Sequence, residues 1–351
     1  MRVHAFSGLD GSRLGAFECS SLSWSDSINE DGSISASTDS AIPSGIMPYK
    51  TVIAAIDDVG VRHAGYVTKV STDETTGVST VSGGGGLTIL QKRLVLNRRL
   101  KSSWRDGTVL IDDDNPPGDW VLSLKGSYRD IVRGLIDETM AWGALPFTLP
   151  GIEGGSHERT YNCWDMATVA DRILDIGGLQ DGPEIRLDPV VSDGAISFAL
   201  NVQDEIVDTV WRWNPRLPGQ GVSLLDTDLD GADMCTQCFG VGGRESDELL
   251  VAMSSGGSLE ALGWPVLQAA NTSHSTISVL KTLQSYVSSD VDSGDDPQDC
   301  RSLSVPSELN VRVGDWADIR GIGQCKVTDV SYASSSPDRI KVSVRKRRGD
   351  G

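Results

Sequence analysis

The chain has 351 residues, 49 of them acidic and 31 basic, so its formal net charge is −18 at pH 7. A groove for nucleic acid needs clustered Lys and Arg, so this charge argues against one. No stretch approaches the roughly 20 apolar residues of a membrane span, and the first residues lack a signal-peptide pattern. We therefore expect a chain that stays in the cytoplasm until it is assembled or released.

Residues 21–38 read SLSWSDSINEDGSISAST, with serine at every odd position on both sides of a short acidic turn. The apolar members of the alternation are Leu22, Trp24, Ile28, Ile34 and Ala36. A period of two predicts a β-hairpin with serines on one face and a buried apolar face. We expect Gly32 to supply a positive φ in the turn, and Asp26 is the one charge on the apolar face. The serine face is either exposed to solvent or packed against another molecule.

Further strand patterns at residues 3–6, 14–18, 51–56 and 64–70 surround this hairpin. The four-glycine run at 83–86 is not followed by GKS or GKT, so we expect a flexible connection rather than a phosphate-binding loop. Residues 1–118 are thus predicted to form a first antiparallel β-barrel-like domain.

An acidic, proline-bearing linker at residues 111–120 precedes a change of pattern. Ser127 and Asp130 form a capping-box variant that starts a helix, and Gly143 ends it. A second amphipathic helix ends at Gly177, and two strand patterns follow. We predict a small α+β domain over residues 119–205.

The remaining sequence returns to strand patterns at 210–213, 238–242, 248–253, 309–313, 316–320, 324–332 and 340–344. A helical pattern begins at Ile277, continues to Val287 and is followed by an acidic segment expected to be a loop. We predict a second β-barrel-like domain from residues 206–256 and 300–351, with a helical insert at 257–299. The predicted fold class is mainly β with α+β insertions.

The sharpest candidate for chemistry is Asp226-Thr-Asp228-Leu-Asp230-Gly231, which matches the first six positions of a calcium loop. The twelfth position is Gln237, which cannot supply the bidentate carboxylate of such a loop. Two interpretations remain open, a bound calcium ion and an acidic surface turn.

Cysteines give two weaker candidates. Cys235 and Cys238 form a single CxxC, but a structural zinc site needs a second pair of ligands, and His274 is too isolated to complete one. Cys163 and His157 are close in sequence, whereas cysteine peptidases place the histidine far along the chain. We therefore expect buried thiols and predict no catalytic, cofactor-binding or metal-binding residues and no enzyme activity.

Several segments resemble one protein family. The opening strand and LSWSDSINEDGSISAST resemble the start of minor tail proteins from long, noncontractile-tailed phages of actinobacteria. GVGGRES, LEALGWPVLQ, TISVLKTLQSYV and VRVGDWADIRGIGQCKVTDVSY are similar to later parts of that family. Some relatives carry a C-terminal peptidase or carbohydrate-binding region, and we expect none here because the sequence stops after its last predicted strand.

This resemblance implies a structural virion protein, the baseplate or tail-tip hub. In the family, two β-barrels per subunit alternate around a trimer and match it to the sixfold tail tube. The implied partners are two further copies, the distal tail protein or tail tube, the tape measure protein and other tail-tip or receptor-binding proteins. DNA would pass through the hub channel without specific binding, past a wall of Asp, Glu and small polar residues. The serine face would then be a subunit-facing or tube-facing surface. A host cell-wall binding protein and a wall-degrading tail enzyme are the alternatives.

Overall fold

The structure is a computed structural model that describes residues 2–40, 42–103, 117–179, 182–217, 219, 221–245, 248–272, 277 and 279–346. Over these ranges the fold consists mostly of β-strands in large antiparallel sheets, with few helices, which confirms the mainly β prediction. Among the described helices we find none with both the length and the apolar character that a membrane-spanning helix requires.

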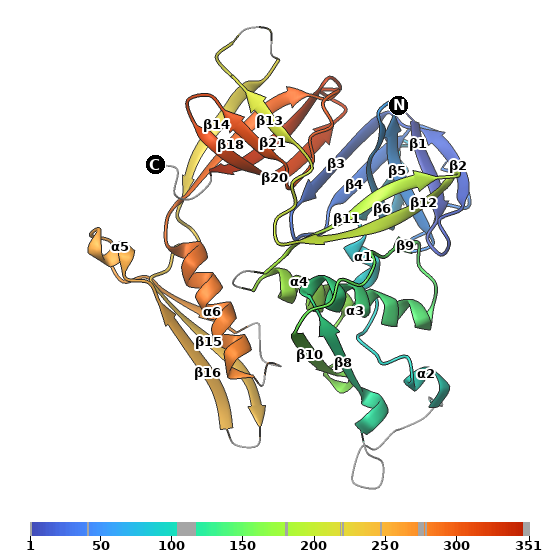
Figure 1. The fold of residues 1–351 in the computed structure, drawn as a ribbon. Helices are drawn as coiled ribbons and strands as arrows, with labels where there is room; N and C mark the ends of the chain where they lie inside the picture. The colour runs from blue at the N-terminus through green and yellow to red at the C-terminus, as the bar shows by residue number, and fades with distance from the viewer. Residues whose placement is uncertain are drawn as a thin grey trace.

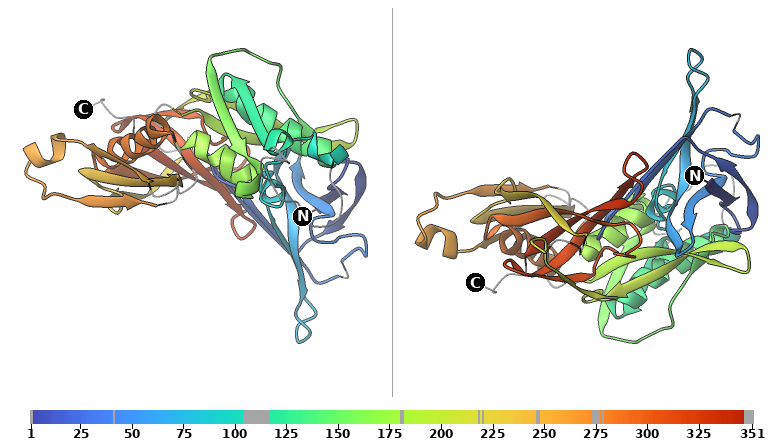
Figure 2. Two further views of the ribbon diagram at one scale, coloured as in Figure 1. Left: turned by 90° about the horizontal axis from the view of Figure 1, so that it is seen from below. Right: turned by 90° about the horizontal axis from the view of Figure 1, so that it is seen from above.

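The N-terminal β block forms one half of a large sheet (Figure 1). Its strands are β1 (Arg2–Ser7), β2 (Arg13–Glu18), β3 (Ser21–Ser27), β4 (Ser33–Thr38), β5 (Thr51–Asp57), β6 (Gly60–Thr72) and β7 (Ser79–Gly84). They pair in the order β3-β4-β7-β6-β5-β1-β2. The predicted hairpin is present as β3 and β4, and the tip of the β6–β7 hairpin projects from the body (Figure 2).

Strand β5 contributes to two apolar cores, one on each face of the N-terminal block. Its sequence TVIAAID is a continuous apolar run rather than an alternation, as expected for a strand buried on both faces. Val52 and Ala54 belong to the core shared with the α+β unit, whereas Ile53 and Ala55 belong to the core shared with the C-terminal strands. The N-terminal block therefore lies between the two other parts of the fold.

The α+β unit covers one face of that block. After the short helices α1 (Leu87–Leu90), α2 (Leu100–Ser103) and η1 (Pro117–Trp120), its elements are β8 (Val121–Gly126), α3 (Tyr128–Trp142), β9 (Phe147–Thr148), β10 (His157–Asn162), η2 (Cys163–Asp165), α4 (Val169–Gly177), β11 (Glu184–Ser192) and β12 (Ala195–Gln203). Helix α3 begins with the predicted capping box, in which Ser127 Oγ accepts from the Asp130 N–H and Asp130 accepts from the Ser127 N–H. Of the predicted linker, residues 111–116 lie outside the described residues.

The C-terminal β block completes the large sheet. Its strands are β13 (Val210–Trp213), β14 (Ser223–Asp230), β18 (Gln298–Pro306), β19 (Trp316–Ile319), β20 (Gly323–Ala333) and β21 (Arg339–Lys346). Strand β20 pairs with β3 over residues 329–333, so the sheet continues from one block into the other. We name this β3–β20 pairing the seam. One apolar cluster includes buried residues from both blocks, so the blocks share a core.

A separate three-stranded sheet stands apart from the large one (Figures 1 and 2). It contains β15 (Gln237–Glu245), β16 (Glu248–Ser255) and β17 (Gln268–Asn271), with α5 (Ser258–Ala261) between strands and α6 (Leu280–Gly294) packed on one face. The sequence-based grouping assigns residues 238–253 to the second β domain, whereas the described residues of this range pair within the small sheet. The domain boundaries themselves stay a prediction.

Three local structures differ from the expectation. Helix α6 continues through the expected acidic loop to Gly294, because Val291 extends the buried stripe of Leu283 and Val287 by one more turn. Residues 309–313 form no strand: Val311 and Val313 are buried in the shared core, but no neighbouring strand among the described residues pairs with this segment. The third difference concerns the turn of the β3–β4 hairpin and is described below.

Candidate functional site

The serines of the hairpin belong to a polar surface that extends across the seam. We name it the hydroxyl face. Its members are Ser21, Ser23, Ser25 and Ser27 of β3, Ser33, Ser35 and Ser37 of β4, Thr80 and Ser82 of β7, Asp329 and Ser331 of β20, Lys341 and Ser343 of β21, and Ser302 and Ser304 of β18. Side chains two apart in a strand share a face, and these residues lie opposite one another in the register. The face therefore extends over both β blocks.

One unbroken row shows how the face crosses the seam. Ser33 pairs with Ser25, Ser25 with Ser331, Ser331 with Lys341, and Lys341 with Ser304. The Ser25 and Ser33 hydroxyls are 2.8 Å apart. Cross-strand hydroxyl pairs of this kind add to sheet stability.

The hydroxyl face also carries charged groups of both signs. Arg339 and Arg345 alternate with Lys341 and Ser343 along β21, Arg339 donates to Ser304 Oγ at 2.8 Å, and Lys69 of β6 pairs with Ser82. Asp329 accepts a hydrogen bond of 2.6 Å from the Ser27 hydroxyl, and Lys341 is exposed. The edge strand β14 adds Asp226, which pairs with Ser302. The surface is thus rich in hydroxyl groups and carries side chains of both charges among them.

The opposite face of the hairpin is apolar, as predicted. Leu22, Trp24, Ile34 and Ala36 are buried, and Ile28 packs against the same core. The Trp24 ring stacks with the His63 ring at 5.7 Å and with the Tyr332 ring at 6.0 Å between centroids. Trp24 therefore connects β3 to β6 within its own block and to β20 across the seam.

Gly32 has a different role from the one expected. Asn29, not Gly32, takes the left-handed conformation in the turn, with a φ of 54°. A Cβ added to Gly32 would lie 2.5 Å from His63 Cε1 and 2.7 Å from the Ser25 carbonyl oxygen. Glycine is required here because the turn approaches a buried ring.

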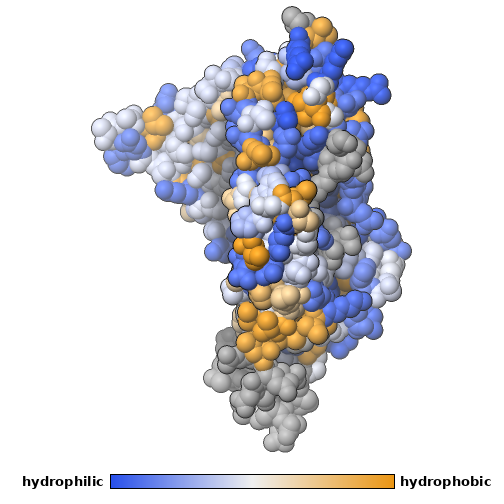
Figure 3. Space-filling view, turned by 90° about the vertical axis from the view of Figure 1, so that its left-hand side faces the viewer, coloured by the Kyte–Doolittle hydropathy of each residue, from blue (hydrophilic) through white to orange (hydrophobic). Residues whose placement is uncertain are grey.

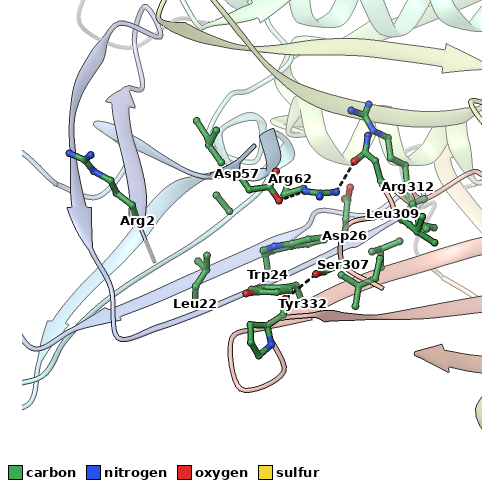
Figure 4. A pocket seen from close by; sticks show the side chains of 18 residues that line it. Arg2, Leu22, Trp24, Asp26, Asp57, Arg62, Ser307, Leu309, Arg312 and Tyr332 are labelled. Carbon is green, nitrogen blue, oxygen red and sulfur yellow. Dashed lines mark hydrogen bonds and ion pairs between the residues drawn. The ribbon is translucent and has the colours of Figure 1, made fainter. Parts of the chain in front are cut away.

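A cleft of about 320 Å³ opens beside the seam, on the apolar side of the sheet (Figure 4). Its deep part contains Trp24, Tyr332 and Asp26, and its rim carries Arg2, Arg62 and Arg312. We name it the seam cleft. The sequence did not predict this cleft. Its far wall is the segment 307–313, and the strand pattern at 309–313 predicted a strand of the sheet there rather than the wall of a cleft.

Arg62 bridges the two blocks at the mouth of the seam cleft. Its Nε donates to Asp57 at 2.6 Å, and its NH1 donates to the side-chain oxygen of Asn310 at 3.2 Å. Arg312 is 3.9 Å from Asp188, and Arg2 is 3.9 Å from Glu18. The guanidinium groups at the cleft are thus each within ion-pair distance of a carboxylate of the same chain, and the aromatic interior also contains the carboxyl group of Asp26.

Two titratable groups lie on the apolar side of the hairpin. Burial raises the pKa of Asp26 to about 6, although the nearby Arg186 acts in the opposite direction. Burial lowers the pKa of His63 to about 4, and its Nε2 has no hydrogen-bond partner among the described residues. Both groups are therefore less charged near neutral pH than exposed side chains of their kind.

The CxxC cysteines are buried thiols. The Cys238 thiol donates to Asp290 Oδ2 at 3.3 Å, and the Cys235 thiol donates to the Asp290 carbonyl oxygen at 3.4 Å. Burial, followed by the hydrogen bond to Asp290, raises the pKa of Cys238 to about 12, and burial also raises the pKa of Cys235. Both thiols are therefore buried hydrogen-bond donors in this structure. His274 lies outside the described residues.

The other candidates are not brought together as sites. His157 begins β10 and Cys163 follows its end, so about 20 Å of extended strand separates them. Asp226, Asp228 and Asp230 lie in the strand β14, not in a loop or turn. Within the described ranges, no group of three or more His, Cys, Asp or Glu side chains is arranged to hold a metal ion.

The three-stranded sheet presents a second unusual surface. Helix α6 covers one of its faces, and the other carries Phe239, Val241, Leu249, Val251 and Met253, with Phe239 opposite Met253 and Val241 opposite Val251. Val251 and Met253 are each 51% exposed. Apolar residues gather on this side of the molecule in Figure 3. Contiguous exposed apolar residues of this kind mark protein interfaces.

Comparisons with known proteins point in one direction. No protein-family model and no curated protein matches the chain. It is similar in structure to a 43 kDa tail protein of prophage MuSo2 from Shewanella oneidensis, with 9% identity, coverage of 99% of this chain and 98% of that one, and a TM-score of 0.60. A tail protein from Neisseria meningitidis MC58 gives 10% identity, coverage of 98% and 96%, and a TM-score of 0.59. Prophage tail protein gp18 from Listeria monocytogenes EGD-e gives 11% identity, coverage of 100% and 96%, and a TM-score of 0.53.

At these identities the likeness concerns the fold. The chain has the fold of phage tail proteins over nearly its whole length. The likeness to tail proteins expected from the sequence is confirmed at this level, and the narrower resemblance to actinobacterial phages stays a prediction.

Proposed function

We propose that this chain is a structural virion protein of a phage tail and forms the hub of the baseplate or tail tip. The observation that carries the proposal is the joining of two β blocks into one sheet with a common hydroxyl face. A hub that contacts a sixfold tube with three subunits needs two comparable β units in each chain, held at a fixed angle. The seam and the shared core would fix that angle.

In this hub, three copies form a closed ring, and the hydroxyl face lines the channel through which DNA leaves. Duplex DNA carries dense negative charge, and each Lys or Arg contact would hold it back. A wall rich in serine hydroxyls presents hydrogen-bonding groups that carry no fixed charge, and its charged side chains have both signs, including Asp329 and the basic Arg339 and Lys341. The sequence analysis expected a wall of Asp, Glu and small polar residues, and the hydroxyl face would supply mostly the small polar ones.

The partners follow from that position. The distal tail protein or tail tube lies above the ring, the tape measure protein ends near it, and other tail-tip or receptor-binding proteins attach to its outside. The apolar open face of the three-stranded sheet supports such contacts, since Val251 and Met253 are left half-exposed. The protein would be assembled in the host cytoplasm and reside at the tail tip of a long, noncontractile-tailed actinobacterial phage. We propose a structural, non-enzymatic role.

Native mass measurement of the purified full-length chain tests the copy number. We expect a closed trimer that does not retard duplex DNA in a gel at moderate salt. A chain that stays monomeric at all concentrations, within tails as well as in isolation, would contradict the hub proposal. Salt-sensitive DNA binding would contradict the channel wall.

A further inference from the structure

Two features of the described chain have no role in the account so far, the buried ring of His63 and the four-glycine run at residues 83–86. A Cβ added to any of these four glycines would lie less than 3.0 Å from a neighbouring atom, so close packing requires glycine there. Gly85 and Gly86 line a cavity of about 30 Å³, and His63 lines the same cavity. We name it the glycine cavity.

The glycine cavity lies between the N-terminal block and the α+β unit. Its walls come from β3, the β3–β4 turn and β6 on one side and from β11 on the other. Polar contacts fix the turn beside it: the side-chain oxygen of Asn29 accepts from the Ile185 N–H at 2.7 Å, and Asp31 accepts from the Leu87 N–H at 3.1 Å. Two parts of the fold therefore meet at this cavity through hydrogen bonds as well as through apolar packing.

His63 brings a buried polar atom to the cavity. Its side chain belongs to a residue that is 4% exposed, and its Nε2 has no hydrogen-bond partner among the described residues. This edge of the ring faces the β3–β4 turn, because a Cβ added to Gly32 would lie 3.1 Å from Nε2, and Gly32 also lines the cavity. A buried polar atom without a partner is costly, and folded proteins usually satisfy it with a protein group or an ordered water.

Asp26 is the second group at the cavity that lacks a charged partner. The neighbouring Arg186 directs its two ion pairs to Asp188 and Asp208, not to Asp26. Asp26 lines the seam cleft as well as the glycine cavity, so its carboxyl group stands between the two. A hydrogen-bond donor inside the cavity would compensate for part of the cost of burying this carboxyl group.

The size and the polar groups of the cavity suit water. A buried water needs about 10–15 Å³ and two to four polar partners, so this cavity has room for roughly two molecules. It is too small for an organic ligand, and the described side chains form no group of three His, Cys, Asp or Glu arranged for a metal ion.

We propose that the glycine cavity is a hydration site, in which one or two ordered waters hydrogen-bond to His63 Nε2 and to the carboxyl group of Asp26. The waters connect β6 to β3 at the place where the α+β unit packs on the N-terminal block. Glycine at positions 32, 85 and 86 keeps the room that they occupy. The site belongs to a single chain, so it does not depend on the copy number of the proposed hub.

A crystal structure of the full-length chain, at a resolution that shows ordered water, tests the site directly. We expect a water peak about 2.7–3.2 Å from His63 Nε2. His63→Phe keeps a ring beside Trp24 but removes the nitrogen, so the water should lose this position. Trp142→Phe is the control, because Trp142 Nε1 is another buried nitrogen without a partner among the described residues but does not line this cavity. An empty cavity in the parent, or a water that keeps its place in His63→Phe, would overturn the proposal.

A matched pair of substitutions tests the site in solution. Ala64 and Ala54 are paired across β6 and β5 and are both buried, but only Ala64 lines the glycine cavity. A serine hydroxyl at position 64 can hydrogen-bond to the cavity water, whereas at position 54 it is buried away from that water. The denaturant midpoint should therefore fall further in Ala54→Ser than in Ala64→Ser. Equal losses, or a larger loss in Ala64→Ser, would contradict a water-filled cavity.

Discussion

Trp24 of β3 stacks with Tyr332 of β20, with ring centroids 6.0 Å apart and an angle of 18° between the rings. The pair lies at the seam, where the register places these two residues directly opposite each other. Two β blocks far apart in the sequence are thus joined by this strand pair and its aromatic stack, together with the shared core and the Arg62–Asn310 hydrogen bond.

Trp24→Ala should therefore destabilise both blocks at once. The truncation removes a ring buried against His63 and Tyr332, and such changes cost about 3–5 kcal/mol. Ser23→Ala changes an exposed residue on the hydroxyl face and should cost little. Thermal and denaturant unfolding of the two variants would measure this. Equal stability of Trp24→Ala and the parent, with a loss in Ser23→Ala, would invert our assignment of the two faces.

Gly32→Ala should destabilise the hairpin because the new methyl group would meet the His63 ring and the Ser25 carbonyl. Overpacking of this kind costs about 1–3 kcal/mol. Gly45→Ala is the control, since a Cβ there meets nothing within 4 Å. Denaturant midpoints of both variants check the prediction, and a Gly32→Ala protein as stable as the Gly45→Ala protein would refute it.

Asp26→Asn should change how stability depends on pH. The raised pKa of Asp26 means that the folded state binds its proton more tightly than the unfolded chain, so its ionisation lowers stability as pH rises from about 4 to about 6. Asn removes that loss, on the order of 1–3 kcal/mol near pH 7 and close to nothing near pH 4.

The lowered pKa of His63 acts in the opposite sense, because the unfolded chain binds that proton more tightly, and stability falls as pH drops from about 6.5 to about 4. In the Asp26→Asn variant the effect of Asp26 is absent, so the fall in stability caused by protonation of His63 should become visible. Chemical unfolding across this pH range, with exposed Asp58→Asn as control, would measure both effects. An Asp26→Asn profile parallel to that of the parent would contradict the assignment.

Replacing Cys235 and Cys238 together by Ser should leave metal content and assembly unchanged. Both thiols are held protonated by burial and are hydrogen-bonded to Asp290, and a serine hydroxyl can donate to the same oxygens. Metal analysis of the purified protein and native mass of the variant give the readout. Stoichiometric zinc or iron that disappears in the double variant would prove us wrong.

Local patterns predicted much of the fold. The alternation around Trp24 indicated the buried face of the hairpin, and the Ser127–Asp130 spacing indicated the start of α3, since both depend on neighbours in sequence. The seam was beyond reach, because nothing within residues 323–333 indicates that β3 is their partner. Periodicity also failed at Val311 and Val313, which are buried without pairing in a sheet of the described chain.

The candidate surfaces also include features that the sequence predicted and features that it could not predict. The serine alternation on β3 and β4 was visible in the sequence, but its continuation through Ser331 and Ser304 depends on the pairing of distant strands. The seam cleft combines Arg2, Arg62 and Arg312 from separate segments, and no spacing rule connects them. Asp226, Asp228 and Asp230 follow a period of two, which also fits a strand, so the sequence carried a signal for β14 as well as for a calcium loop.

The most direct test of the account is the density of the intact tail with this chain located in it. The account predicts three copies in one closed ring at the tail tip, with Ser25, Ser33, Ser304 and Ser331 facing the central channel. A single copy per tail, a ring with the hydroxyl face turned outward, or a channel wall dominated by Lys and Arg would contradict it.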